Sequence, residues 1–215
     1  MSNTKKIDWA DALRPLLERY RGEKHPLNYH NEYELMVMVI LSARGTDKII
    51  NEIAEKLFAA YPSIKDLAKA KLKDILKFTK SVPGSIKKST WLLENAKKLA
   101  GTDKMPNTMK ELRDLKGIGR KSANVIIRES GGVAEGIIVD LHVLRVAPRL
   151  GIAEGENPVK IEQQLMKTLP HEYWGDIGMA FSFLGREICR PTNPKCPECP
   201  VNTVCDYYEK VKKEG

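Results

Sequence analysis

Segments with the period of an α-helix recur along the whole chain, each with its own start and stop signals, and no stretch has a convincing alternating strand pattern. The run Leu35–Leu41 is apolar on nearly every side, and Asn31 and Glu34 before it have the spacing of a capping box. We therefore expect a nearly all-α fold in which this run forms a central buried helix.

The other predicted helices have the same kinds of start and stop signals. We predict a helix with Ile50, Ile53 and Leu57 on one stripe, a helix capped by Ser63, a turn over Ser81–Gly84, and helices over Ser85–Leu99, Thr108–Leu115, Lys121–Arg128, Leu141–Leu150 and Val159–Leu169. Thr108 and Glu111 again have capping-box spacing. No segment reads as a long linker, so two domains, if present, must share the chain intimately.

Charge and composition limit the class of protein. The chain has 215 residues, 42% of them hydrophobic, which suffices for one large domain or two small ones. The net charge of +8 favours a polyanionic partner, nucleic acid before membrane, although a well-solvated basic surface is the plainer alternative. No segment is long and apolar enough to span a bilayer, and the polar start up to Asp8 has no signal core behind it. We expect a soluble monomer of the cytoplasm or nucleoid with no membrane partner.

A short glycine hairpin separates two of the predicted helices. Gly117 and Gly119 let the backbone turn sharply and leave N–H groups at the start of the next helix. Those donors and the helix dipole would bind a phosphate without reading a base sequence. An ordinary helix–helix turn is the alternative, because Gly-x-Gly alone is a weak signal.

Longer segments around the hairpin carry a resemblance. Leu115–Val125 resembles the helix–hairpin–helix of the endonuclease III family of DNA glycosylases, and Val139–Val143 resembles the segment that follows it. The likeness runs from about Pro26 to Tyr208 and includes Leu41–Ala43 with Thr46 and Asp47.

This resemblance implies a two-lobed helix–hairpin–helix glycosylase fold. A six-helix domain would span residues 28–134, and an iron–sulfur cluster domain would combine residues 1–27 and 135–215. Double-stranded DNA would lie across the cleft between the lobes, in contact with Gly117, Gly119 and Arg120 of the hairpin.

Lys121 is a candidate nucleophile. In the first turn of its helix the dipole opposes a cation and favours the neutral amine. Such an amine can attack the sugar of a flipped-out nucleotide, expel the base, and hold the sugar as a Schiff base from which the 3′ phosphate is eliminated. Taken alone, a surface lysine that contacts phosphate is the commoner outcome. The resemblance matches Lys121 to the catalytic lysine of the family.

Asp140 is a candidate partner of Lys121, although a helix N-cap would by itself explain an aspartate at this position. The helix from Lys121 rises roughly 15 Å and the segment after it can reach back about 30 Å, so Asp140 can return near the lysine. A carboxylate there would stabilise the developing positive sugar or accept a proton from the amine. The resemblance matches Asp140 to the catalytic aspartate of the family. His142 reads as a structural histidine.

Four cysteines, Cys189, Cys196, Cys199 and Cys205, are separated by six, two and five residues, and the chain has no others. Such a cluster can surround one metal centre. Zinc is an alternative that prefers two close pairs, and disulfides are disfavoured in a reducing compartment. The spacing matches the [4Fe–4S] site of the endonuclease III family at every gap. By that resemblance the loop after the first cysteine would present Arg190 and Lys195 to the DNA backbone.

The sequence departs from the family where the lesion is chosen. Arg44 stands where the family usually has Gln, which could alter the preference for the opposite base, although a plain phosphate contact explains an arginine nearly as well. Ser81–Ser85 lacks the bulky apolar wedge usual at this point, and Leu141 replaces the usual Thr.

The resemblance implies a bifunctional DNA glycosylase and AP lyase of base excision repair, with oxidised pyrimidines as the default substrate and abasic sites as the lyase substrate. The alternatives are a monofunctional mismatch or damaged-base glycosylase and a non-catalytic helix–hairpin–helix DNA-binding protein. Lys121 argues against the first, as does a chain that stops soon after Cys205. A binding protein would not need Lys121 and Asp140 together. An iron–sulfur electron carrier would explain only the cysteines.

Overall fold

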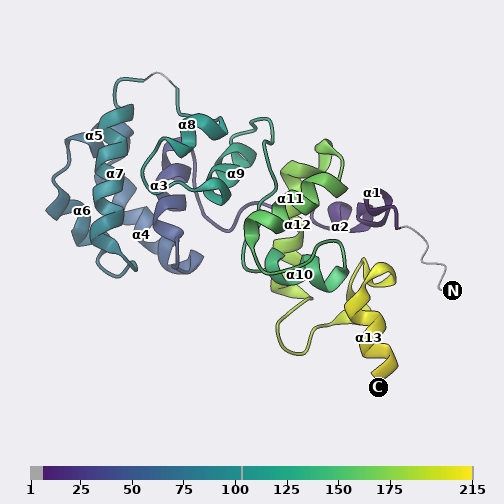
Figure 1. Ribbon diagram of the computed structural model, residues 1–215. Helices are drawn as coiled ribbons and strands as arrows, with labels where there is room; N and C mark the ends of the chain where they lie inside the picture. The colour runs from purple at the N-terminus through teal and green to yellow at the C-terminus, as the bar shows by residue number, and fades with distance from the viewer. Residues whose placement is uncertain (1–6, 103, 215) are drawn as a thin grey trace. The chain divides into compact units, whose positions relative to one another are not determined.

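The computed structural model describes residues 7–102 and 104–214, and within them the chain forms helices and connecting loops without a β-strand (Figure 1). The expected all-α fold is confirmed. The polar start of the chain up to residue 6 lies outside the described residues. In chain order the α-helices are α1 (Trp9–Ala12), α2 (Arg14–Arg19), α3 (Glu32–Ser42), α4 (Asp47–Ala60), α5 (Ile64–Lys69), α6 (Leu72–Thr79), α7 (Ser85–Leu99), α8 (Met109–Arg113), α9 (Arg120–Glu129), α10 (Val143–Leu150), α11 (Pro158–Thr168), α12 (Trp174–Glu187) and α13 (Asp206–Glu214). Three short 3₁₀ turns lie at η1 (His171–Tyr173), η2 (Cys196–Glu198) and η3 (Asn202–Val204).

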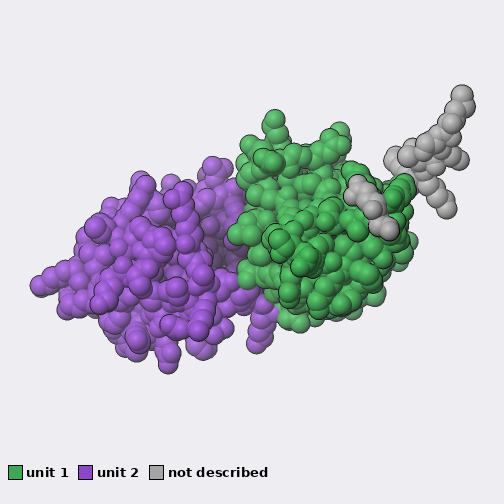
Figure 2. Space-filling view, turned by 90° about the horizontal axis from the view of Figure 1, so that it is seen from below, with its two compact units in different colours: residues 1–23, 134–215 green, residues 24–133 purple. Residues whose placement is uncertain are grey.

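The chain divides into two compact units (Figure 2). Unit 1 combines both ends of the chain, residues 1–23 and 134–215, and unit 2 is the continuous segment 24–133. Helices α3 to α9 therefore belong to unit 2, and the remaining helices belong to unit 1. None of the helices in the described ranges has both the length and the apolar content needed to cross a membrane.

The core of unit 2 is built on α3. Every residue from Tyr33 to Leu41 is buried, and α3 packs against α4, α7 and α9. The prediction of a central buried helix is thus confirmed. Helix α7, which occupies the predicted range, packs against α5 and α6 as well as α3.

Local capping signals account for most helix starts in unit 2. Thr108 and Glu111 form the complete capping box of α8, and the Ser63 side chain caps α5. The box expected at α3 is only half formed: the Asn31 side chain accepts from the Glu34 N–H at 3.0 Å, but the Glu34 carboxylate accepts from His30 N at 2.8 Å. Helix α8 ends two residues before the predicted Leu115, because tighter bonds of the i to i−3 type already turn the chain there.

The core of unit 1 joins the two ends of the chain. Leu13 and Leu16 from α1–α2 are fully buried together with Phe181 of α12 and Val143 of α10. Gly178 lets the segment 137–139 lie directly on α12, since a Cβ at this position would be 2.4 Å from the Ile138 carbonyl oxygen. This close contact fixes the segment that leads into Asp140.

Candidate functional site

The glycine hairpin joins α8 to α9, but its two glycines play different parts. Gly117 has a φ of 81°, and a Cβ there would lie 2.5 Å from the Trp91 ring, so both conformation and space require glycine. Gly119 is extended, with a φ of −90°, and a Cβ would meet nothing within 4 Å. The expectation that both glycines make the turn is therefore corrected. Gly119 instead leaves the N-terminus of α9 open to approach from outside.

Asn95 of α7 holds the hairpin in place. Its buried side chain donates to the Lys116 carbonyl and accepts from the Lys116 N–H, both at 2.9 Å. The sequence pattern did not single out Asn95. A polar residue on the inward stripe of a helix was the available signal, because buried amides are almost always hydrogen-bonded.

Lys121 is the second residue of α9, the first-turn position that was predicted, and it is exposed. The first turn carries no acidic side chain. His25 lies within electrostatic reach. Burial lowers the pKa of His25 to about 4, the Glu129 carboxylate opposes this shift, and the positive charge of Lys121 adds to it.

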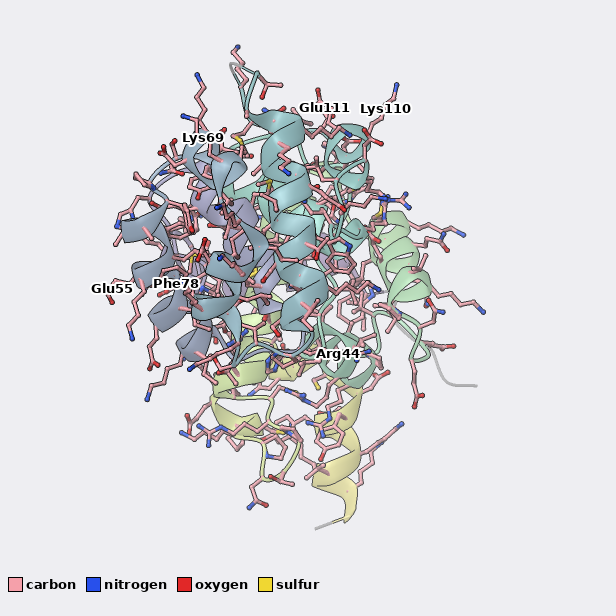
Figure 3. The ribbon with its side chains drawn as sticks, turned by 90° about the vertical axis from the view of Figure 1, so that its left-hand side faces the viewer. Arg44, Glu55, Lys69, Phe78, Lys110 and Glu111 are labelled. Carbon is pink, nitrogen blue, oxygen red and sulfur yellow. The ribbon has the colours of Figure 1, made fainter. Side chains whose placement is uncertain are left out.

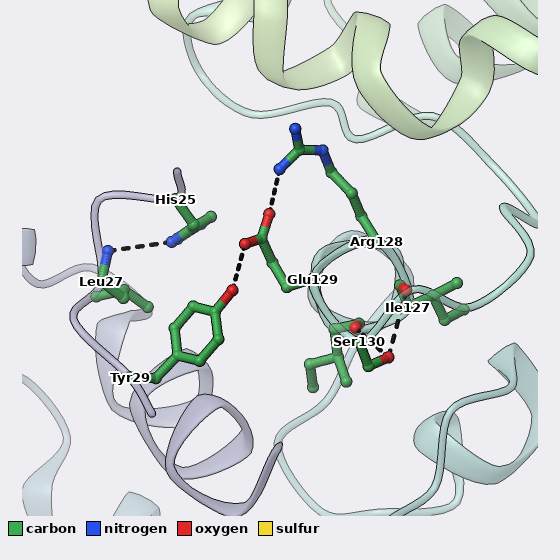
Figure 4. Close-up of polar contacts among 8 residues, drawn as sticks. His25, Leu27, Tyr29, Ile127, Arg128, Glu129 and Ser130 are labelled. Atoms are coloured by element: carbon green, nitrogen blue, oxygen red, sulfur yellow. Dashed lines mark hydrogen bonds and ion pairs between the residues drawn. The ribbon is translucent and has the colours of Figure 1, made fainter. Parts of the chain in front are cut away.

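Unit 2 contains a polar group of three side chains that the sequence did not suggest (Figure 4). The Tyr29 hydroxyl donates to the Glu129 carboxylate, which also pairs with the Arg128 guanidinium. Beside them, His25 Nδ1 accepts from the Leu27 N–H at 3.2 Å. The bond from Tyr29 to Glu129 ties residues 25–29 to the C-terminal end of α9, whose N-terminal turn carries Lys121.

Asp140 binds the backbone just ahead of α10 and is held from a second side. The helix begins at Val143 with His142 as its N-cap residue, two residues later than the predicted start at Leu141. Its Oδ1 accepts from the N–H groups of His142 at 2.8 Å and Val143 at 2.9 Å. Its Oδ2 accepts from the Ser182 hydroxyl of α12 at 2.7 Å, and Ser182 is buried. His142 Nδ1 lies 3.2 Å from Arg145 Nη2, a contact that fits the structural role expected for it. Leu141 is 67% exposed beside the aspartate.

Lys121 belongs to unit 2 and Asp140 to unit 1. Each is described within its own unit, and their meeting at one site stays a prediction.

Arg44 lies two residues after the end of α3 and is exposed with a φ of 62°, a left-handed conformation that is unusual for a residue other than glycine. The turn Ser81–Gly84 is present, and its Val82 is buried, so this segment offers no apolar wedge. The next apolar side chain, Ile86 in the first turn of α7, is 68% exposed. Ile86 was missed because a helix pattern does not distinguish an exposed apolar residue from a core one.

The four cysteines lie in unit 1 and line one pocket together with side chains of α10, α12 and α13. None of the four forms a disulfide. Burial raises the pKa of Cys199 to about 11 and also raises the pKa values of Cys196 and Cys205. Within residues 7–102 and 104–214, no three side chains of His, Cys, Asp or Glu are grouped as ligands of a metal ion.

The chain between the first two cysteines is exposed and held by Arg149 of α10. The Arg149 guanidinium donates to the carbonyls of Arg190 at 2.7 Å and Pro191 at 3.1 Å, and its Nη1 lies 3.6 Å from Cys189 Sγ. Arg190 and Lys195, the two predicted DNA contacts, are both exposed, and Lys195 makes a surface ion pair with Glu198 at 3.5 Å.

The amino-acid sequence is similar to a known protein family and to individual members of it. The model of the HhH-GPD superfamily of base excision DNA repair proteins matches residues 37–171. Endonuclease III of Haemophilus influenzae is 35% identical, covering 99% of this chain and 100% of the relative, and that of Bacillus subtilis is 32% identical, covering 100% and 98%.

The fold is also similar to solved structures of DNA repair proteins. A trapped endonuclease III–DNA covalent intermediate is similar with a TM-score of 0.83 and 30% identity, covering 94% of this chain and 96% of the other. A thermostable thymine-DNA glycosylase, at 22% identity and a TM-score of 0.74, shares the fold and covers 91% and 94%.

Proposed function

This chain belongs to the endonuclease III family within the HhH-GPD superfamily of base excision DNA repair proteins, and on that premise we propose that Lys121 and Asp140 are its catalytic residues. The protein is a bifunctional DNA glycosylase and lyase of base excision repair, and its partner is DNA. The observation that carries the assignment is the position of Lys121, exposed in the first turn of α9 and two residues after the open backbone at Gly119.

The chemistry follows from that position. Gly119 and the first N–H groups of α9 hold a DNA phosphate, with the hairpin residues Gly117 and Arg120 beside it. The neutral Lys121 amine attacks C1′ of the flipped-out nucleotide, and the bond from C1′ to the base breaks. The departing base takes up a proton, the lysine nitrogen loses one, and the C1′–O4′ bond of the sugar ring breaks as O4′ is protonated. The resulting Schiff base between C1′ and the lysine makes the C2′ proton acidic. Its loss breaks the C3′–O bond and releases the 3′ phosphate.

Asp140 supports this step with a fixed carboxylate. An ionised carboxylate has about four acceptor positions, and His142 N, Val143 N and the Ser182 hydroxyl use three of them. Oδ2, which accepts from the Ser182 hydroxyl, keeps acceptor capacity for the proton of the attacking amine or for the positive charge on the sugar.

We propose that the four cysteines hold a [4Fe–4S] cluster. They fit such a group because all four thiols are free and line the same pocket, and because their spacing is the one found in this family. Residues 189–205 would be cross-linked through the four cysteines that hold the cluster, and the exposed chain that carries Arg190 and Lys195 would thereby be ordered for contact with the DNA backbone.

We further propose oxidised pyrimidines as the default lesion, a monomeric protein, and action in the nucleoid. Arg44 and Ile86 are the side chains of unit 2 most suited to influence the choice of lesion or opposite base. Both are exposed. Arg44 stands where the family usually has Gln, and Ile86 directly follows Ser81–Ser85, the segment that lacks the usual apolar wedge.

The test is borohydride trapping on duplexes that contain an abasic site or thymine glycol. The native protein should form a covalent adduct with both duplexes, and Lys121→Ala should form none while still binding DNA. Lys110→Ala is the matched control, because it removes an exposed lysine from the neighbouring helix α8 and should trap normally.

An adduct on the abasic duplex alone would leave a lyase whose base substrate lies elsewhere. If Lys121→Ala traps as well as the native protein, the lysine assignment is wrong. DNA binding with no adduct in any variant would favour a monofunctional glycosylase or a binding protein.

A further inference from the structure

Lys88 of α7 is a buried lysine whose amine points at the end of another helix. Its side chain is only 6% exposed, and its Nζ donates to the carbonyl oxygen of Leu41 at 2.8 Å and to that of Ala43. These are among the last carbonyls of α3, which have no partners within their own helix. Burying an ammonium group is unfavourable unless it is hydrogen-bonded, and the negative end of a helix dipole is a favourable place for it.

The carbonyl of Ala43 is half of the peptide group that joins Ala43 to Arg44. Lys88 therefore fixes the orientation of the peptide at which the chain leaves α3. Arg44 follows with a φ of 62°, and the Gly45 N–H then closes the turn on the Ser42 carbonyl at 2.9 Å. An arginine does not adopt this left-handed conformation by preference, so the surrounding contacts must hold it there.

Charge gives an independent sign that the two side chains act on each other. Burial lowers the pKa of Lys88, and the positive charge of Arg44 lowers it further. The two cations repel, and only Arg44 has access to solvent. Figure 3 shows the labelled Arg44 near one end of α7, the helix that carries Lys88.

We propose that Lys88 is a positioning residue for specificity: by holding the Ala43–Arg44 peptide it presents the Arg44 guanidinium to DNA in one orientation. This inference rests on the proposed contact of Arg44 with DNA. Lys88 itself does not touch the DNA. It acts through Arg44, and its loss should therefore affect binding and discrimination more than the chemical step.

A double-mutant cycle tests the coupling. We would measure the Kd for a duplex with a non-cleavable abasic analogue, opposite each of the four bases, for Lys88→Met, Arg44→Ala and the double variant. Met keeps the length of the side chain without the amine. Arg44→Ala and Lys88→Met should each weaken binding about tenfold and reduce discrimination between opposite bases. The double variant should be within about twofold of Arg44→Ala alone, because both changes remove the same interaction.

Lys87→Met is the matched control. It removes the same charge from the adjacent position, where the side chain is exposed over the Trp91 ring. It should alter Kd by no more than about twofold, the size of an ordinary surface effect. The saturated single-turnover rate of strand cleavage at an abasic site should stay the same in Lys88→Met. Additive losses in the double variant, or equal effects of Lys87→Met and Lys88→Met, would overturn the inference.

If Lys88→Met does not fold, position 44 gives a second test. Ala is strained at a φ of 62° and Gly is not, so Arg44→Gly should melt roughly 2–4 °C above Arg44→Ala. Equal melting temperatures would show that the left-handed turn is not held, and the inference would fail.

The outcomes also separate this inference from the proposed function. Unchanged binding in Arg44→Ala would refute the role of Lys88 while leaving the Lys121 adduct intact. If Lys121→Ala still forms the covalent adduct, the lysine assignment is wrong, but the measured coupling between Lys88 and Arg44 is unaffected.

Discussion

His25 is a residue whose protonation should couple the stability of the fold to pH. Burial lowers its pKa to about 4, compared with 6.5 for an ordinary histidine. As pH falls below 6.5 the unfolded chain gains a proton at this residue that the folded protein does not bind. Stability should therefore decrease between pH 6.5 and pH 4, by up to about 3 kcal/mol.

Urea unfolding at pH 7.5 and pH 4.5 checks this expectation. His25→Gln should lose less free energy of unfolding between the two values than the native protein does. If both proteins lose the same amount, His25 does not make the proposed contribution.

The residues found from the sequence and those missed differ in the range of their contacts. The position of Lys121 and the bonds of Asp140 to the N–H groups of His142 and Val143 involve neighbours within a few residues, so local rules indicated both. Asn95, Ser182 and Lys88 act on partners 21, 42 and 47 positions away. No periodicity or cap signal reports such a partner, because it is the packing of helices that brings the two groups together.

At the level of elements, we predict different effects for substitutions of the two glycines in the helix–hairpin–helix. Gly117→Ala adds left-handed strain and a clash with Trp91, which should cost about 2–3 kcal/mol and lower the melting temperature by roughly 4–10 °C. Gly119→Ala meets no neighbour and is extended, so its melting temperature should stay near that of the native protein. It should instead weaken DNA binding, because the new methyl group occupies the space offered to a phosphate.

Calorimetry and DNA titration of the two variants check this division. The reverse pattern, with Gly119→Ala unstable and Gly117→Ala weak only in binding, would contradict it. Equal binding by Gly119→Ala and the native protein would remove the N-terminus of α9 from the DNA interface.

Elements were predictable where a sequence signal marks both ends. Helix α7 occupies the predicted range 85–99. The turn before it and the end of the helical period after Leu99 can both be read from neighbouring residues. Helix α8 is shorter than predicted because the hairpin, whose geometry depends on Trp91 and Asn95 of another helix, begins to turn the chain early.

At the scale of the whole molecule, the two ends of the chain come together in one core. Unit 1 is assembled from both ends, and the Tyr173 hydroxyl donates to the Ala10 carbonyl at 2.9 Å, across 163 positions. Sequence patterns predict helices but not which distant helices share a core, so this pairing was expected only from the resemblance. Cys205 and Val201 belong to the same core. The proposed cluster would therefore fasten the last turns of the chain onto unit 1.

That position predicts how removal of the cluster affects the protein. Protein purified without oxygen should contain about four iron and four sulfide per chain and no zinc. Chelation of the iron, or Cys199→Ala, should speed amide hydrogen exchange in α10 and α12 by at least about tenfold, equivalent to about 1.4 kcal/mol, because the core of unit 1 loses a cross-link. Exchange in α3, which belongs to unit 2, is the internal control and should not change.

Zinc in place of iron would overturn the assignment of the cofactor. Equal acceleration in α3 and α12 would instead mean that the two units unfold together, so that the cluster stabilises the whole molecule and not unit 1 alone.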